Sequence, residues 1–202
     1  MKEEVSTEEL IINAARKVFT TRGYNGARMQ EIADEAGINK AMLHYYYRSK
    51  DKLFDIIFDE AVDKLMLRIN TVFEAQGSIT DKIAVIVDMY ITTLSDNPYL
   101  PLFVLHEMSQ HSDRIVKRFM AKPNFPNIQL FLDEVNKEIK QKKIAKIEPE
   151  QLLINVLAMC VFPFVAKPLI QGVLRKDDVA YKVLLEERKR SVVKFINAAL
   201  AI

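Results

Sequence analysis

Two short helical segments that meet at a glycine constrain the fold more than any other feature of this sequence. Residues 29–36 and 39–46 have the length and apolar spacing of short helices, and Gly37 joins them. Glycine reaches the backbone conformation of a tight turn at little cost. Ala33 is small where the second segment must approach the first closely, and Leu43 can fill the space between the segments. The pattern predicts a helix-turn-helix; the alternative is an ordinary helical hairpin.

The rest of the chain also has the composition and the periodicity of helices. Only 5 of the 202 residues are glycine, and no segment alternates apolar and polar residues as a strand does. Ser49 can cap a long helix that reaches about Ala75. Further helices are expected over residues 81–94, 101–110, 112–120, 128–143, 149–162 and 178–202, with Pro163 and Pro168 bending or ending the one before them. The prediction is an all-α fold of about nine helices.

The second segment of the motif carries a run of polar-tipped rings among cations. His44 and the tyrosines at 45–47 lie close to Lys40 and Lys50, and residues 10–50 hold 7 Lys and Arg against 3 Asp and Glu, in a chain of formal net charge +2. Phenol and imidazole groups can donate hydrogen bonds to phosphate oxygens, and helix-turn-helix proteins place this helix in the major groove of DNA. Helical phase turns Tyr47 toward the core. The residues expected to contact DNA are Asn39, Lys40, Ala41, Met42, His44, Tyr45, Tyr46 and Lys50.

The sequence IADEAGINKAMLHYYYRSKDKL, residues 32–53, resembles the DNA-binding motif of the TetR family of repressors, and the segment before it matches the family's usual opening. The chain departs from the family pattern at four positions: Arg28 stands where Thr is usual, Ala41 where Gly is, His44 where Tyr is and Tyr47 where Phe is. The resemblance adds Arg28 as a phosphate contact and Gln30 as a contact to a base. It also implies a ligand pocket in the remainder of the chain and a dimer made by the last two helices.

We therefore predict two domains: a three-helix helix-turn-helix DNA-binding head over residues 1–54 and a larger helical ligand-binding and dimerisation domain over residues 55–202. The second domain is rich in aromatic and methionine residues between Met89 and Phe162, which favours either a packed apolar core or a mostly apolar ligand cavity. The residues expected to line such a cavity are Tyr90, Phe103, His106, Phe131, Asn155, Met159 and Phe162.

The second domain has no catalytic signature and no Gly-rich phosphate loop. Cys160 lies in an apolar segment, where packing is a better explanation than a role as a nucleophile. His106 and His111 are five residues apart and so do not share a helix face; a metal site with Glu107 is an alternative, but solvated or hydrogen-bonded roles are favoured. We expect no enzyme activity, no cofactor and no metal.

The sequence thus favours a DNA-binding transcriptional regulator, a repressor that a small, mostly apolar ligand releases from its operator. The expected partners are a near-palindromic double-stranded operator, an unknown small-molecule effector and a second copy of the chain. A polar N-terminus, a single cysteine and the absence of a long apolar segment indicate a cytoplasmic protein without a membrane partner. The alternatives are a helix-turn-helix protein without ligand control, and an apolar-ligand carrier or helical enzyme whose hairpin merely packs.

Overall fold

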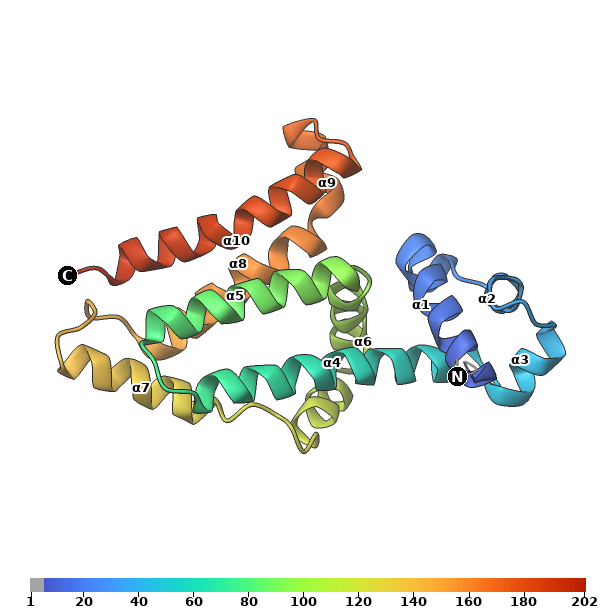
Figure 1. Ribbon diagram of the computed structural model, residues 1–202, viewed down its shortest axis with the longest axis horizontal. Coiled ribbons are helices and arrows are strands. Elements are labelled where there is room, and N and C mark those ends of the chain that lie inside the picture. Colours follow the sequence, from blue (N-terminus) through green and yellow to red (C-terminus); the bar gives the residue numbers. More distant parts are fainter. Residues whose placement is uncertain (1–5) are drawn as a thin grey trace, which may run out of the picture.

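The chain is built of helices that form a small head and a larger body (Figure 1). This computed structural model describes residues 6–202, apart from the side chains at positions 110–112 and 114. That part of the chain holds ten helices and no strand: α1 Thr7–Gly26, α2 Met29–Glu35, α3 Lys40–Tyr46, α4 Lys50–Glu74, α5 Ile79–Asp96, α6 Leu100–Met120, α7 Ile128–Lys140, α8 Pro149–Val165, α9 Lys167–Leu174 and α10 Asp178–Leu200. The all-α prediction is confirmed. Residues 100–120 form one helix where two are expected, and α9 is a separate helix that the sequence pattern does not predict.

The head packs α1, α2 and α3 around a small core of its own. The hydroxyl of Ser6 accepts a hydrogen bond from the backbone N–H of Glu9 at 3.2 Å and so caps the start of α1. Gly23 interrupts α1 with φ at 68° and ψ at 172°, and one further helical turn follows the kink. The buried side chains of the head include Ile11, Ala14, Ala15, Val18, Phe19, Ile32, Ala33 and Leu43.

Helix α4 joins the head to the body without a break (Figure 1). Ser49 caps it as expected, because its hydroxyl accepts a hydrogen bond from the N–H of Lys52 at 3.2 Å. The first turns of α4 bury Leu53 and Phe54, and later turns bury Val62 and Met66. The expected boundary between residues 54 and 55 therefore falls inside a continuous helix, and the division into two domains stays a prediction.

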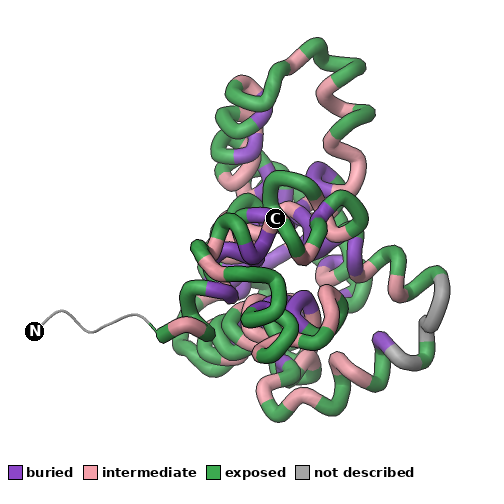
Figure 2. The backbone as a smooth tube through the Cα atoms, turned by 90° about the vertical axis from the view of Figure 1, so that its right-hand side faces the viewer, coloured by how far each residue is buried: buried purple, intermediate pink, exposed green. Residues whose placement is uncertain are grey.

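The body is centred on α5, which packs against α4, α8 and α10. Figure 2 shows the buried residues gathered in the middle of the molecule, whereas the turns at the top, where α9 lies, are exposed or half-buried. None of the residues of α9 is buried. Between residues 6 and 202, no single helix is both long and apolar enough to cross a membrane; α8 and α9 reach that length and composition only as a pair bent by 75°.

Two buried charged residues tie the far end of the body together. The ammonium of Lys82 donates to the carbonyl oxygen of Phe73 at 3.0 Å and pairs with the carboxylate of Glu134 on α7. The carboxylate of Glu138 accepts a hydrogen bond from the N–H of Ile79 at 3.0 Å, which satisfies an otherwise unpaired donor at the start of α5. Lys82 and Glu138 are each only 5% exposed, so these bonds replace the water that both charges have lost.

Candidate DNA-binding surface and internal cavity

The turn between α2 and α3 has the geometry that the sequence predicts. Gly37 has φ at 69°, and the N–H of Ile38 donates to the carbonyl oxygen of Ala33 at 3.0 Å. A Cβ at Gly37 would meet no atom within 4 Å, so the position needs glycine for its backbone conformation and not for space. Ala33 and Leu43 are fully buried where α2 and α3 meet. This arrangement fixes the angle between α2 and α3.

Helix α3 presents polar and aromatic side chains to solvent. Asn39 caps the helix, since its side-chain oxygen accepts a hydrogen bond from the N–H of Met42 at 2.8 Å. Tyr45 is 84% exposed and packs edge-on against Tyr46 at 5.5 Å between ring centroids. Tyr47 is half-buried against the core, as its helical phase predicts. Nine of the ten residues expected to contact DNA lie on the head, and Lys50 is the first residue of α4. Tyr46 and Lys50 are half-buried, and the other eight are exposed: Arg28, Gln30, Asn39, Lys40, Ala41, Met42, His44 and Tyr45.

Two of these residues are held by contacts within the head. The amide nitrogen of Gln30 donates to the carboxylate of Asp34 at 2.7 Å. The ammonium of Lys50 donates to the carbonyl oxygens of Tyr24 at 2.8 Å and Ala27 at 3.3 Å, and it lies 4.5 Å from the centroid of the Tyr24 ring. A phosphate contact by Lys50 would therefore use the third N–H of its ammonium group.

A cluster of aromatic rings joins the head to the body. Phe103 of α6 lies 4.3 Å from Phe54 and 5.7 Å from Tyr24, between ring centroids, and it is 8% exposed. The hydroxyl of Tyr24 donates to the carboxylate of Asp51. Burial, helped by this hydrogen bond, raises the pKa of Tyr24 well above its usual range. Phe103, which the sequence places in a ligand cavity, thus belongs to the joint between head and body.

An apolar cavity of about 410 Å³ lies inside the body. Its walls come from α4, α5, α6 and α8 and from the segment before α7; they include Phe58, Ala61, Val62, Leu65, Met66, Ile69, Tyr90, Leu94, Pro101, Val104, Leu105, Met108, Phe119, Phe125, Leu157 and Val161. Burial raises the pKa of Tyr90 to about 12, so its phenol stays protonated at neutral pH. The volume lies within the range of roughly 300–1,000 Å³ that is typical of small-molecule pockets.

Of the seven residues expected to line a ligand cavity, only Tyr90 does so. Phe131 packs on Phe73 with 5.4 Å between ring centroids, and His106 is exposed on α6. On α8 the cavity is lined by residues 157 and 161, whereas Asn155, Met159 and Phe162 lie on other sides of the helix. Phe162 is 57% exposed. The composition predicts an apolar interior here, but the phase of each helix decides which residues meet the cavity.

The remaining candidates are Cys160 as a nucleophile and His106, Glu107 and His111 as metal ligands. Cys160 is fully buried, as the packing interpretation predicts, and burial raises the pKa of its thiol to about 12. Among the described residues, no group of three or more His, Cys, Asp or Glu is placed to hold a metal ion. The side chain of His111 lies outside the described residues, so the alternative of a metal site with His106 and Glu107 stays untested.

Comparison with known proteins agrees with this geometry. The family model for bacterial regulatory proteins of the tetR family matches residues 11–57. The chain is 24% identical to the probable HTH-type transcriptional regulator YttP of Bacillus subtilis (strain 168), over 98% of this chain and 99% of YttP. It is 22% identical to the HTH-type transcriptional regulator RutR of Escherichia coli (strain K12), over 94% of this chain and 90% of RutR.

The fold is also found in a solved structure of a regulator. The crystal structure of the transcriptional regulator FadR from Bacillus subtilis, in complex with stearoyl-CoA, superposes with a TM-score of 0.62 at 16% sequence identity, over 95% of this chain and 98% of FadR. The family match falls on α1 to α3 and the start of α4, where the turn at Gly37 and the exposed face of α3 lie. Residues 11–57 therefore carry the helix-turn-helix of the tetR family of bacterial regulatory proteins, and the chain as a whole is similar to transcriptional regulators that bind DNA through this motif.

Proposed function

We propose that the protein is a repressor that leaves its operator when a small, mostly apolar ligand occupies the cavity of the body. The observation that carries this proposal is the double role of α4. Residues 58–69 of this helix line the cavity, and its first turns pack Leu53 and Phe54 against the head. A ligand that changes how α4 packs therefore changes the position of the head. FadR of Bacillus subtilis, which has the same fold, binds stearoyl-CoA, a molecule with a long apolar part.

The ligand acts only through its different affinities for two arrangements of the protein. In one arrangement the two recognition helices of a dimer fit the DNA, and in the other they do not. The coupling between two such sites is typically about 1–3 kcal/mol, and it is reciprocal: the operator must weaken ligand binding by the same factor by which the ligand weakens operator binding.

The proposed dimer uses an exposed apolar surface on α8 and α10. Phe162 and Ile154 on α8 are 57% and 54% exposed, and Val183 and Phe195 on α10 are 54% and 64% exposed. Apolar side chains that gather on one face of a helix pair favour association with a second copy. Two copies would present two α3 helices to successive major grooves, roughly 34 Å apart, on a near-palindromic site.

In this proposal residues 1–54 bind DNA and residues 55–202 bind the ligand and form the dimer. The contacts to DNA come from the ten residues named above, with the exposed rings and amides of α3 toward the groove and Arg28 and Lys50 toward the phosphates. As a bacterial regulator the protein would work in the cytoplasm, where the DNA is.

The test begins with a duplex selected from a random pool by the protein itself. We expect a near-palindromic sequence, bound by two chains, with an affinity that falls steeply as salt rises. Phe195→Glu should convert the dimer to monomers in sedimentation and weaken operator binding. Leu67→Glu is the matched control, since Leu67 is 54% exposed on α4, away from the proposed interface.

Ligand control is tested separately, by titrating candidate compounds into the protein with and without the operator. The proposal is supported if the operator weakens ligand binding by the same factor by which the ligand weakens operator binding. If the operator does not change the affinity for the ligand, the protein is a helix-turn-helix regulator without ligand control. A protein that binds apolar compounds but no DNA at any salt concentration would instead be a carrier.

A further inference from the structure

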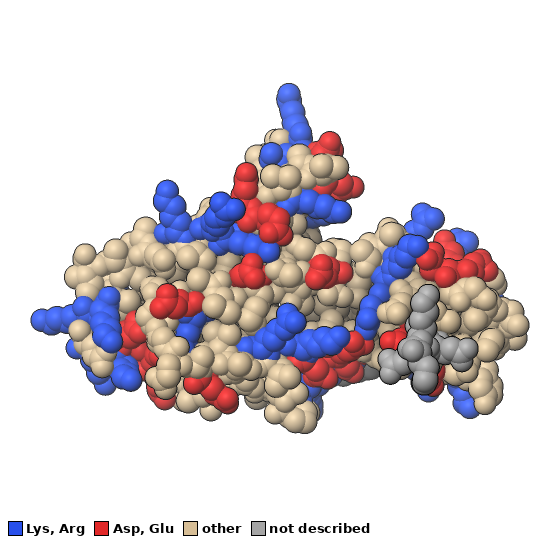
Figure 3. Space-filling model, viewed as in Figure 1, with Lys and Arg blue, Asp and Glu red and all other residues tan. Residues whose placement is uncertain are grey.

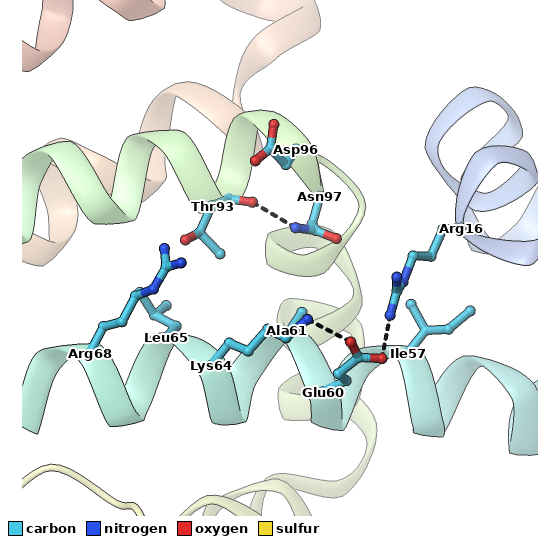
Figure 4. Close-up of a pocket in the computed structure, with 10 residues that line it drawn as sticks. All are labelled: Arg16, Ile57, Glu60, Ala61, Lys64, Leu65, Arg68, Thr93, Asp96 and Asn97. Atoms are coloured by element: carbon cyan, nitrogen blue, oxygen red, sulfur yellow. Dashed lines mark hydrogen bonds and ion pairs between the residues drawn. The ribbon is translucent and has the colours of Figure 1, made fainter. Parts of the chain in front are cut away.

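A polar cleft opens on the outer side of the gap between α4 and α5, next to the head. Its volume is about 310 Å³. Residues 57–68 of α4 form one side, and the end of α5 from Thr93 with its C-cap Asn97 forms the other. Arg16 of α1 closes the end toward the head (Figure 4). Figure 3, which shows the same face of the molecule, has a band of Lys and Arg atoms across its middle with acidic atoms beside it.

The charges in the cleft leave one guanidinium without a partner. Glu60 is shared by two cations, since its carboxylate pairs with Arg16 and also with the ammonium of Lys64 at 2.7 Å. Arg68 forms no hydrogen bond or ion pair with any residue whose side chain the structure describes. Figure 4 shows Arg68 extending from α4 toward Thr93, while Asp96, the other carboxylate of the cleft, points away from α4. The middle of the cleft thus offers a guanidinium and a hydroxyl, with no carboxylate between them.

The floor of this cleft is also a wall of the apolar cavity. Ala61 and Leu65 line both spaces. On α5 the two spaces are lined by neighbouring residues, Thr93 facing the cleft and Leu94 facing the cavity. The side chains of Ala61 and Leu65, which are both half-buried, therefore lie between the polar space and the apolar one.

We propose that the ligand of this protein is an anionic amphiphile whose apolar chain occupies the cavity and whose carboxylate or phosphate group binds Arg68 in the cleft. This inference rests on the proposed ligand control and adds the chemical class of the ligand. A guanidinium presents paired N–H donors that match the oxygens of a carboxylate or a phosphate, and the Thr93 hydroxyl can donate a further hydrogen bond. The apolar chain of the ligand would pass between α4 and α5 at Ala61 and Leu65, which line both spaces.

This arrangement also explains how ligand binding would change the contact between the body and the head. The anionic group would lie in the same cleft as Glu60, whose carboxylate holds Arg16 of α1. A second negative charge in this cleft attracts the cations that hold Glu60, Arg16 and Lys64, so ligand binding weakens the contact between α4 and α1. The apolar chain and the charged group would then act on the same helix from its two sides.

The test compares three probes with the same apolar chain on the full-length protein: decanoate, decyl phosphate and the neutral decanol. Calorimetric titration should show both anions binding at least about tenfold more tightly than decanol. Arg68→Gln should reduce the affinity for the anions about tenfold and leave that for decanol within a factor of two. Arg190→Gln is the matched control, because Arg190 is an exposed arginine on α10, and it should change none of the three affinities. Comparison of decanoate with decyl phosphate shows which of the two anionic groups the cleft prefers.

Inorganic phosphate serves as a fourth probe, with the charge and no chain. If decanol binds as tightly as the anions and Arg68→Gln has no effect, the inference is overturned while an apolar ligand and the proposed function stand. If inorganic phosphate binds Arg68 as tightly as decyl phosphate, the cleft is a separate anion site, and the amphiphile is refuted. If the amphiphiles bind through Arg68 but leave operator affinity unchanged, the inference about the ligand holds and the proposed function fails.

Discussion

Replacement of Arg118 by methionine should loosen the contact between α6 and α4 and so lower stability and ligand control together. The guanidinium of Arg118 binds both carboxylate oxygens of Asp59, at 2.9 and 3.2 Å, and one oxygen of Asp55 at 2.8 Å. It also lies 5.0 Å from the centroid of the Phe58 ring. Methionine keeps an apolar stem of similar length and removes the charge, so the variant tests the ion pairs more than the packing.

The size of the effect follows from how far these groups are exposed. The side chain of Arg118 is 20% exposed, and those of Asp55 and Asp59 are each 39% exposed. Exposed ion pairs contribute about 0–1 kcal/mol, whereas breaking a buried pair costs about 3–5 kcal/mol. A half-exposed, bidentate pair lies between these limits, and we expect a loss of about 1–2 kcal/mol. For a chain of this length that corresponds to a fall in Tm of roughly 2–8 °C.

The pH dependence gives an independent measure of the same contact. Partial burial raises the pKa of Asp59, but hydrogen bonds from Arg118 and Lys122 outweigh it and hold the pKa below its usual value. A carboxylate of this kind adds stability above its unfolded pKa, and that stability is lost as the pH falls through its folded pKa. The difference in stability between the wild type and Arg118→Met should therefore be constant near neutral pH and shrink below about pH 4.

The assay is thermal and urea denaturation of the wild type, Arg118→Met and the control Lys117→Met at equal protein concentration, followed by the operator titration with ligand. Lys117 is the exposed neighbour on the same helix and forms no ion pair with the described residues. We expect Lys117→Met to behave as the wild type, and Arg118→Met to show a smaller effect of ligand on operator affinity. Equal melting of all three proteins, or a stability difference that persists at low pH, would refute the reasoning.

Three further predictions concern other parts of the fold. Lys82→Met leaves the carboxylate of Glu134 without its buried partner and should lower the free energy of unfolding, measured with urea, by about 2–3 kcal/mol. The control is Lys137→Met, an exposed position on the same helix as Glu134, which should change this free energy by less than about 0.5 kcal/mol. Gly37→Ala forces an alanine to the φ of 69° at the turn and should lower the free energy of unfolding by about 1–2 kcal/mol; unchanged stability would show that the turn tolerates a Cβ there. The thiol of Cys160, with its pKa raised to about 12 by burial, should resist iodoacetamide at pH 8 in the folded protein and react in urea, so rapid alkylation of the native protein would contradict its place in the core.

The helix-turn-helix could be predicted from sequence because its determinants are local. Gly37 supplies a backbone conformation, Ala33 supplies a small side chain, and Leu43 fills the space between two helices that are four residues apart in the chain. Where local patterns compete with distant contacts, the prediction is less complete. Pro163 lies inside α8 and does not end it, and the carbonyl oxygen of Pro163 accepts a hydrogen bond from Tyr181 of α10 at 2.7 Å. That bond joins residues eighteen positions apart, and no pattern near Pro163 indicates it.

The cavity and the cleft could not be predicted in this way, because their lining depends on which side of each helix faces its neighbours after packing. Aromatic composition indicates an apolar interior, but a difference of one position on α8 separates Val161, which lines the cavity, from Phe162, which is mostly exposed. The state of Arg68 is a stronger example. In the sequence it is one of 29 Lys and Arg residues, and it becomes distinctive only in the folded chain, where it lines a cleft whose nearest α4 carboxylate, Glu60, pairs with Arg16 and Lys64. A single arginine on a solvated helix face carries no information about a ligand. An arginine without a partner, in a cleft that shares Ala61 and Leu65 with an apolar cavity, indicates a ligand with an anionic group and an apolar chain.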